Sequence, residues 1–80
     1  MNSSGQLIIG GIYRAWGHEA HIVSVTLDNG ETALIAVLEN GDTWHADENA
    51  LAGATFLRNQ PITPAEYAAA RMQARGDGMR

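Results

Sequence analysis

Three histidines are the residues of this chain whose spacing could bind a metal ion. His18 and His21 form an H-x-x-H pair, and His45 follows a tryptophan. Zinc needs ligand atoms within about 2.1 Å of one ion. The strand register predicted below places His21 and His45 on one face but on non-adjacent strands, with α-carbons about 12 Å apart. We therefore predict no metal site, and we expect His45 to be a hydrogen-bonded histidine at the rim of a sheet.

Catalysis has no better candidates among the other polar residues. Ser24 and Thr26 fall within a predicted strand rather than at a strand-to-helix elbow, and no Ser-His-acid arrangement stands out. Glu39 and Asp42 flank a predicted turn, where solvated carboxylates make poor general acids. The Gly10-Gly11 pair lacks the pattern of a phosphate-binding loop. The sequence predicts neither an enzyme nor a bound cofactor.

The distribution of charge narrows the class of partner. Residues 1–70 contain eight acids and two arginines, whereas residues 71–80 contain three arginines and one acid. Nucleic-acid affinity depends on Lys and Arg displacing counterions, so an acidic body disfavours direct nucleic-acid binding. The chain has no cysteine, and the apolar run at 7–9 is far shorter than a signal-peptide core or a membrane span. We predict a cytoplasmic protein without a membrane partner.

An internal repeat predicts most of the architecture. The segment LDNGET at 27–32 recurs eleven residues later as LENGDT at 38–43. Asn-Gly between β-prone segments is the strongest short-range hairpin signal, because a type I′ turn needs positive φ at both central residues. Two such turns predict a meander of three strands, at about 21–27, 32–38 and 43–46.

Two-residue turns also predict a register, in which Val25 pairs with Leu34 and Val37 pairs with Trp44. Side chains alternate between the two faces of a sheet. One face is then expected to carry His21, Val23, Val25, Leu27, Leu34, Ala36, Leu38 and His45. The other is expected to carry Ile22, Ser24, Thr26, Ala33, Ile35, Val37 and Trp44. The central strand is apolar on both faces, so each face needs a cover or serves as a contact surface.

The rest of the chain supplies candidate covers. Residues 12–16 and 54–58 are predicted to be strands, with a turn at Gly17-His18. Thr63 as N-cap, Pro64 at the first helical position and Glu66 in a capping box predict a C-terminal helix over 64–75 that ends at Gly76.

The predicted fold class is α+β and mostly β: a small antiparallel meander or SH3-like barrel of about five strands with a C-terminal helix. We expect a flexible N-terminus at 1–10, one domain at 11–75 and a frayed tail at 76–80.

The acids and one tryptophan form the candidate partner-binding residues. Consecutive hairpins turn at opposite ends of a meander, about 20 Å apart for a seven-residue strand. One end is expected to carry Asp28, Glu31, Asp47 and Glu48, and the other Glu19, Glu39 and Asp42. These carboxylates either keep the turns soluble or pair with arginine and lysine on a basic partner.

Trp44 is expected to be core if the helix covers its face through Tyr67 and Met72. Otherwise Trp44 is the aromatic anchor of a contact surface. The core alternative is favoured.

Two resemblances bear on fold and function. The motif Gly11-Ile12-Tyr13-Arg14, followed by Glu31-Thr32, Gly41, Trp44 and Phe56, resembles a small bacterial β-domain family of unknown function, which implies a compact β-fold and no activity. A small, acidic, cysteine-free chain without a catalytic site is also similar in profile to phage-encoded inhibitors, including anti-CRISPR proteins. That resemblance implies docking on the basic surface of a nucleic-acid-binding complex.

The leading functional hypothesis is a non-enzymatic protein-binding module, an inhibitor whose acidic ends dock on such a basic surface as a nucleic-acid mimic. The chain itself is expected to be a monomer or a weak homodimer. One alternative is a structural or assembly domain that self-associates through a sheet edge or the Trp44 face. A metal-dependent enzyme is the third alternative, supported only by the histidines.

Overall fold

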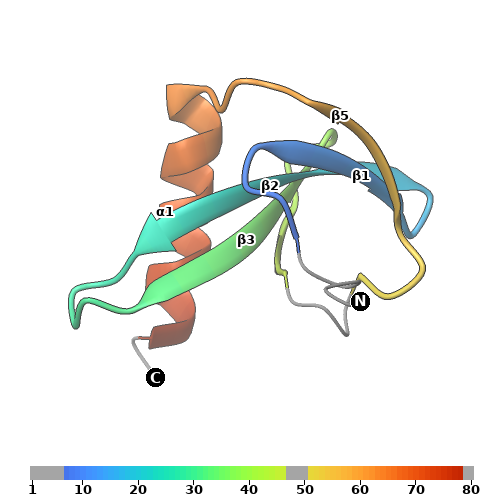
Figure 1. Cartoon of the computed structure of the whole chain (residues 1–80). Coiled ribbons are helices and arrows are strands. Elements are labelled where there is room, and N and C mark those ends of the chain that lie inside the picture. Colours follow the sequence, from blue (N-terminus) through green and yellow to red (C-terminus); the bar gives the residue numbers. More distant parts are fainter. Residues whose placement is uncertain (1–6, 47–50, 79–80) are drawn as a thin grey trace.

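The fold is an antiparallel sheet with one helix packed against it (Figure 1). The computed structural model describes residues 7–46 and 51–78, with side chains as far as 75. The elements are β1 (Gly11–Ala15), β2 (His18–Thr26), β3 (Thr32–Leu38), β4 (Thr43–His45), β5 (Thr55–Asn59) and α1 (Pro64–Gly78). The strand order is β4-β3-β2-β1-β5, and every pairing is antiparallel. The predicted α+β, mostly β meander with a C-terminal helix is confirmed, as an open sheet with β4 and β5 at its edges.

The two Asn-Gly hairpins are present, but their turns differ from the predicted type. In the β2–β3 turn (residues 27–31), Gly30 N–H donates to Leu27 O at 2.9 Å and Leu27 N–H donates to Glu31 O at 2.7 Å. Gly30 has φ +88°, whereas Asn29 keeps negative φ. This is a three-residue loop that glycine closes as a bulge. The Asn29 side-chain oxygen accepts the Glu31 N–H at 2.9 Å, which stabilises the asparagine in this turn.

The β3–β4 turn (residues 38–42) repeats this geometry, with Gly41 at φ +95° and Asn40 Oδ1 accepting the Asp42 N–H. Each loop has one residue more than a type I′ turn. Both registers therefore shift by one, so that Val25 pairs with Ala33 and Ala36 pairs with Trp44.

This shift makes the predicted composition of the two faces wrong, because one residue of slip moves a strand's side chains to the opposite face. Val23 and Val25 share a face with Ile35 and Val37 of β3, not with Leu34, Ala36 and Leu38. Trp44 shares its face with Ile22, as predicted, but not with Ile35 and Val37. His21 and His45 do share a face, on β2 and β4 with β3 between them.

Each face of the sheet has its own core. The helix-side core consists of Val23, Val25, Ile35, Val37, Ala70 and Ala74. The opposite core consists of Tyr13, Ala20, Ile22, Ala36, Leu38, Ala46 and Leu51, with Leu7 packed against it. Helix α1 contacts β2, β3 and β4, whereas β1 and β5 extend away from it (Figure 1). The helix therefore covers the face that lacks Trp44.

The start of α1 confirms the local signals in the sequence. Thr63 Oγ1 accepts the Glu66 N–H at 3.1 Å, and Glu66 Oε1 accepts the Thr63 N–H at 3.0 Å. These reciprocal bonds are a capping box. The helix continues through Gly76 to Gly78, beyond the predicted end, because glycine lowers helix stability without breaking the helix. In the described part of the chain, no helix has the length and apolar character needed to cross a membrane.

Ile8 and Gly10, which precede β1, are hydrogen-bonded to the sheet. Gly10 N–H donates to Ile22 O at 2.8 Å, and Ile8 N–H donates to the Tyr13 hydroxyl at 3.1 Å. A Cβ added at Gly11 would lie 3.0 Å from the Phe56 ring, so close packing requires glycine there. Tyr13 and Phe56 meet edge to face, 5.4 Å between ring centroids. Residues 1–6 lie outside the described part of the chain.

Candidate functional site

The turn between β1 and β2 holds a tryptophan in an uncommon backbone conformation. Ala15 pairs with His18, so Trp16 and Gly17 form a two-residue turn, one position earlier than predicted. Trp16 has φ 55° and Gly17 has φ 76°. Two central residues with positive φ are typical of a type I′ turn, where Asn, Asp or Gly is usual. A bulky side chain there costs about 1–3 kcal/mol and is a common sign of function.

Trp16 stacks on Trp44, and the pair is exposed. The ring centroids are 5.2 Å apart and the ring planes differ by 21°. Trp16 is 43% exposed and Trp44 is 50% exposed, so Trp44 is not the core residue that the sequence favoured. Tyr67 and Met72, the predicted cover, are themselves exposed on α1. Exposed tryptophans are the residues that most often anchor protein interfaces.

The Glu39 side chain forms hydrogen bonds between the two hairpins that carry the tryptophans. His18 Nδ1 lies 3.0 Å from Glu39 Oε2, and Glu19 N–H donates to Glu39 Oε1 at 3.1 Å. His18 and Glu19 follow the Trp16 turn, whereas Glu39 begins the loop that precedes Trp44. The hydrogen bond from His18 is the main reason that the pKa of Glu39 is lowered from its ordinary value of 4.5. Glu39 is thus a positioning residue for the tryptophan pair.

A shallow hollow adjoins Trp16. It has a volume of about 220 Å³ and is lined by Arg14, Ala15, Trp16, Gly17, Ala52, Gly53 and Ala54. Most of these side chains are small, so the backbone of the 52–54 turn approaches the indole. The tryptophan pair and this hollow form one surface, which we call the tryptophan surface.

The other predicted binding residues are only partly brought to this surface. Glu39 lies beside it, and Asp42 is in the same turn, where it accepts a bond from the Asn40 side chain at 3.2 Å. Glu19 pairs with Arg58 of β5 at 3.0 Å.

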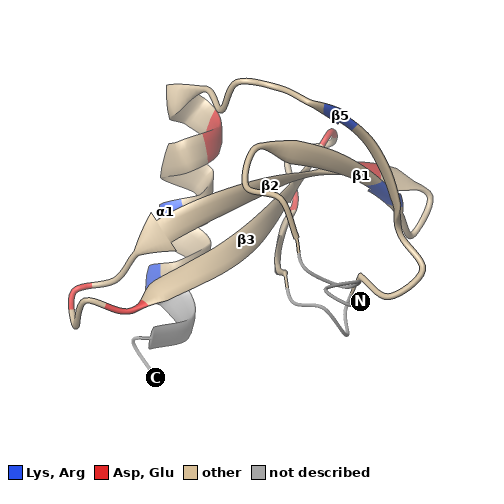
Figure 2. Ribbon diagram, viewed as in Figure 1, with Lys and Arg blue, Asp and Glu red and all other residues tan. Residues whose placement is uncertain are grey.

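Asp28 and Glu31 lie in the β2–β3 turn at the other end of the strands, as predicted, next to basic positions of α1 (Figure 2). Asp47 and Glu48 lie outside the described residues.

The histidines have structural partners rather than a common ligand. His18 is held by Glu39, and buried His21 lies between Glu66 Oε2 at 2.8 Å and Gln60 O at 2.9 Å. Across the ranges 7–46 and 51–78, no group of three or more His, Cys, Asp or Glu side chains could hold a metal ion.

Sequence reasoning missed Trp16 as a site residue. The sequence predicts the turn at Gly17-His18, because Gly17 is the evident turn residue, whereas tryptophan is rarely found at positive φ and gives no turn signal of its own. Comparisons with protein-family models, with curated proteins and with solved structures give no match to this chain. The geometry of its own residues therefore carries the functional argument.

The role of Glu39 leads to a spectroscopic prediction. The Glu39→Ala substitution is expected to weaken the exciton-coupled circular dichroism of the stacked indoles, because both hydrogen bonds from the Glu39 side chain to the strand after the Trp16 turn are lost. Asp42→Ala is the matched control, since Asp42 contacts only its own turn. In the unmodified protein the signal should persist at pH 4.5 and weaken only at lower pH, because the pKa of Glu39 is lowered. Equal signals in the two variants would contradict this role.

Proposed function

We propose that this chain is a non-enzymatic protein-binding module whose anchor is the tryptophan surface. In the fuller form of the proposal it is an acidic inhibitor, of the kind found among phage anti-CRISPR proteins, that covers the basic nucleic-acid-binding surface of a larger complex. The observation that carries the proposal is the stacked pair of Trp16 and Trp44, which is exposed to solvent. Trp16 has positive φ, and Glu39 bonds the two hairpins that carry the tryptophans. Neither core cluster includes Trp16 or Trp44, so packing of the core does not account for their stacking at the surface.

Charge supports a basic partner. Glu39 and Asp42 lie in the turn that precedes Trp44, and the chain carries nine acids against five arginines. A guanidinium of the partner can lie over an indole face while it donates to a nearby carboxylate, which combines cation–π attraction with a charge-assisted hydrogen bond.

Some of the acids already form ion pairs within the chain, which limits how many can bind a partner directly. Glu19 already holds Arg58, and Glu39 already holds His18. We therefore assign the anchor to the tryptophans. The acids contribute long-range attraction that speeds association and weakens as salt is added.

The test uses the affinity of a partner captured with the unmodified chain and then purified. Trp44→Ala is expected to weaken binding about 30-fold, as expected when a central anchor is truncated. Met72→Ala is the control, because Met72 is equally apolar and 75% exposed on α1, which packs on the opposite face of the sheet. Unchanged affinity in both Trp16→Ala and Trp44→Ala would contradict the proposal. If only charge reversal of Asp28 and Glu31 weakened the affinity for the partner, the binding site would instead be the acids of the β2–β3 turn.

The open edges of the sheet support self-association as a second function. β4 and β5 each pair with one neighbour, and most of β5 is exposed. Unpaired edges can template pairing with another copy. Sedimentation velocity distinguishes the two functions, because a concentration-independent monomer contradicts self-association and leaves the partner proposal intact.

A further inference from the structure

A cavity separate from the tryptophan surface lies between the β2–β3 turn and the later turns of α1. Its volume is about 240 Å³, and its lining includes Val25 and Leu27 of the sheet side and Ala74 of the helix. Pockets for drug-sized molecules are about 300–1,000 Å³, so this cavity fits a smaller ligand. Half-buried Leu27 supplies most of the accessible apolar wall, because Val25 and Ala74 are only 1% and 3% exposed, and this wall suits a short hydrocarbon group.

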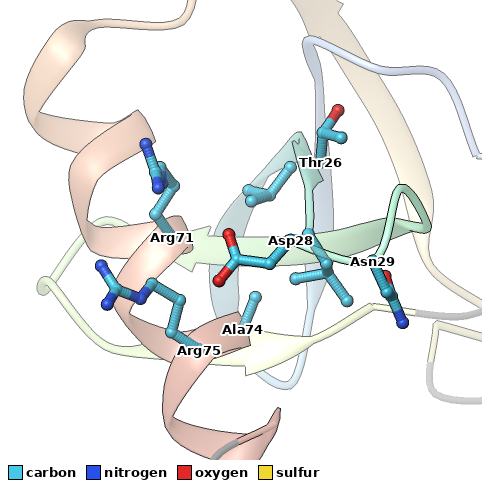
Figure 3. Close-up of a pocket in the computed structure, with 8 residues that line it drawn as sticks. Thr26, Asp28, Asn29, Arg71, Ala74 and Arg75 are labelled. Atoms are coloured by element: carbon cyan, nitrogen blue, oxygen red, sulfur yellow. The ribbon is translucent and has the colours of Figure 1, made fainter.

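Three charged side chains surround the opening. Arg71 and Arg75 are one helical turn apart and extend from the same side of α1, and Asp28 points from the turn toward them (Figure 3). In the described ranges no ion pair joins Asp28 to either arginine. The guanidinium groups of Arg71 and Arg75 extend away from Asp28 in Figure 3, so all three charged groups are open to a ligand.

The chemistry of this lining identifies a ligand class. Two guanidinium groups present donors that match a carboxylate. A ligand with only a carboxylate would also face the like charge of Asp28. A ligand that carries an ammonium group next to its carboxylate satisfies Asp28 as well, and the apolar wall accepts its side chain.

We propose that this cavity binds a small hydrophobic α-amino acid, of the size of leucine, with its carboxylate on Arg71 and Arg75 and its ammonium group on Asp28. The side chain lies against Val25, Leu27 and Ala74. This site lies at the end of the sheet opposite the Trp16 turn, so ligand and partner protein can bind independently. The proposal does not rest on the function of the tryptophan surface.

The ligand test compares L-leucine with two analogues, each of which lacks one charged group. 4-Methylpentanoate has no ammonium group, and 3-methylbutylamine has no carboxylate. Titrations followed by backbone amide chemical shifts should give a dissociation constant of about 1 mM for L-leucine, as expected for so few contact atoms at an open site. Each analogue should bind at least tenfold more weakly. The shifts should be confined to residues 25–30 and 71–75, and the indole N–H signals should not move.

Variants of the charged groups complete the test. The double substitution Arg71→Gln and Arg75→Gln, and the single substitution Asp28→Asn, should each weaken L-leucine binding at least tenfold. These side chains are exposed, so the fold should be retained. Arg58→Gln is the matched control, because Arg58 is exposed on β5 and lines neither this cavity nor the hollow beside Trp16.

The proposal is overturned if L-leucine causes no shifts at concentrations far above 1 mM, or if the variants bind it as well as the unmodified chain. Equal binding of 4-methylpentanoate and L-leucine would overturn the role of Asp28 and leave a simple carboxylate site.

Discussion

The Ala70→Asp substitution is expected to lower the free energy of unfolding by about 4 kcal/mol, because it buries a charge without a partner. Ala70 is fully buried in the helix-side core with Val23 and Ile35. Domains of this length are stable by roughly 4–12 kcal/mol, so the variant should be largely unfolded or have its helix detached. Denaturant unfolding followed by far-ultraviolet circular dichroism measures the change.

The control for this prediction is Met72→Asp, two residues along the same helix. Met72 is 75% exposed, and a surface substitution there should change stability by less than about 0.5 kcal/mol. The pair distinguishes the observed helix orientation from the predicted one, in which Met72 covered the sheet. A larger loss for Met72→Asp than for Ala70→Asp would contradict the observed packing. Loss of helical signal with retained stacking of Trp16 and Trp44 would show that α1 detaches while the sheet stays folded.

The elements could be predicted because their signals are local. Asn-Gly between apolar segments located both hairpins, and Thr63 with Glu66 located the start of α1 to the residue. Such signals depend on a few neighbouring side chains that act on the same stretch of backbone. The order of β1 to β4 follows from consecutive hairpins, which extend a sheet one strand at a time, whereas the pairing of β5 with β1 was not predicted.

The register could not be predicted from the same signals. A type I′ turn and a three-residue loop closed by glycine both accept Asn-Gly, and they differ by one residue. The bonds from Asn29 to Glu31 and from Asn40 to Asp42 accompany the longer loop. Two small local preferences thereby decided which side chains of β3 lie under the helix. The error about Trp44 followed from this, because its expected neighbours Ile35 and Val37 lie on the other face.

The site was harder to predict than the fold, because its parts are distant in the sequence. Trp16 and Trp44 meet only when β1 and β4 are placed in one sheet with β2 and β3 between them. Topology alone placed Asp28 and Glu31 at one hairpin end and Glu19, Glu39 and Asp42 at the other, as the structure has them, whereas Asp47 and Glu48 lie outside the described residues. Their pairing with His18 and Arg58 depends on side-chain positions that the strand pattern does not determine.

The His21→Leu substitution is expected to lower the free energy of unfolding by about 3 kcal/mol at neutral pH, because it removes the polar contacts of a buried imidazole with a carboxylate and a carbonyl oxygen. His21 is 3% exposed and joins β2 to the start of α1 through Glu66 and to the preceding linker through Gln60. Leucine has a similar volume, so the loss reports the polar contacts rather than a cavity. Urea unfolding of the variant and the unmodified chain measures the difference.

The pH dependence separates the charge interaction from simple packing. Partial burial raises the pKa of Glu66, but the Thr63 N–H and the His21 ring outweigh this effect, so the pKa falls below its ordinary value of 4.5. A carboxylate with a lowered pKa stabilises the fold fully above 4.5, and this contribution is lost as the pH falls through the folded-state value. The contribution of Glu66 to the difference between the two proteins should therefore shrink as the pH falls below 4.5.

Glu66→Gln is the matched background for this prediction. Glutamine can retain the capping box while the charge is removed. In that background His21→Leu should cost about 1–2 kcal/mol less than in the unmodified chain, and the pH dependence of the difference should vanish. A cost that is the same in both backgrounds, or constant from neutral pH to well below 4.5, would contradict a charge interaction between His21 and Glu66. The helix would then be held against β2 by the packing of Ala70 and Ala74 on Val23 and Val25.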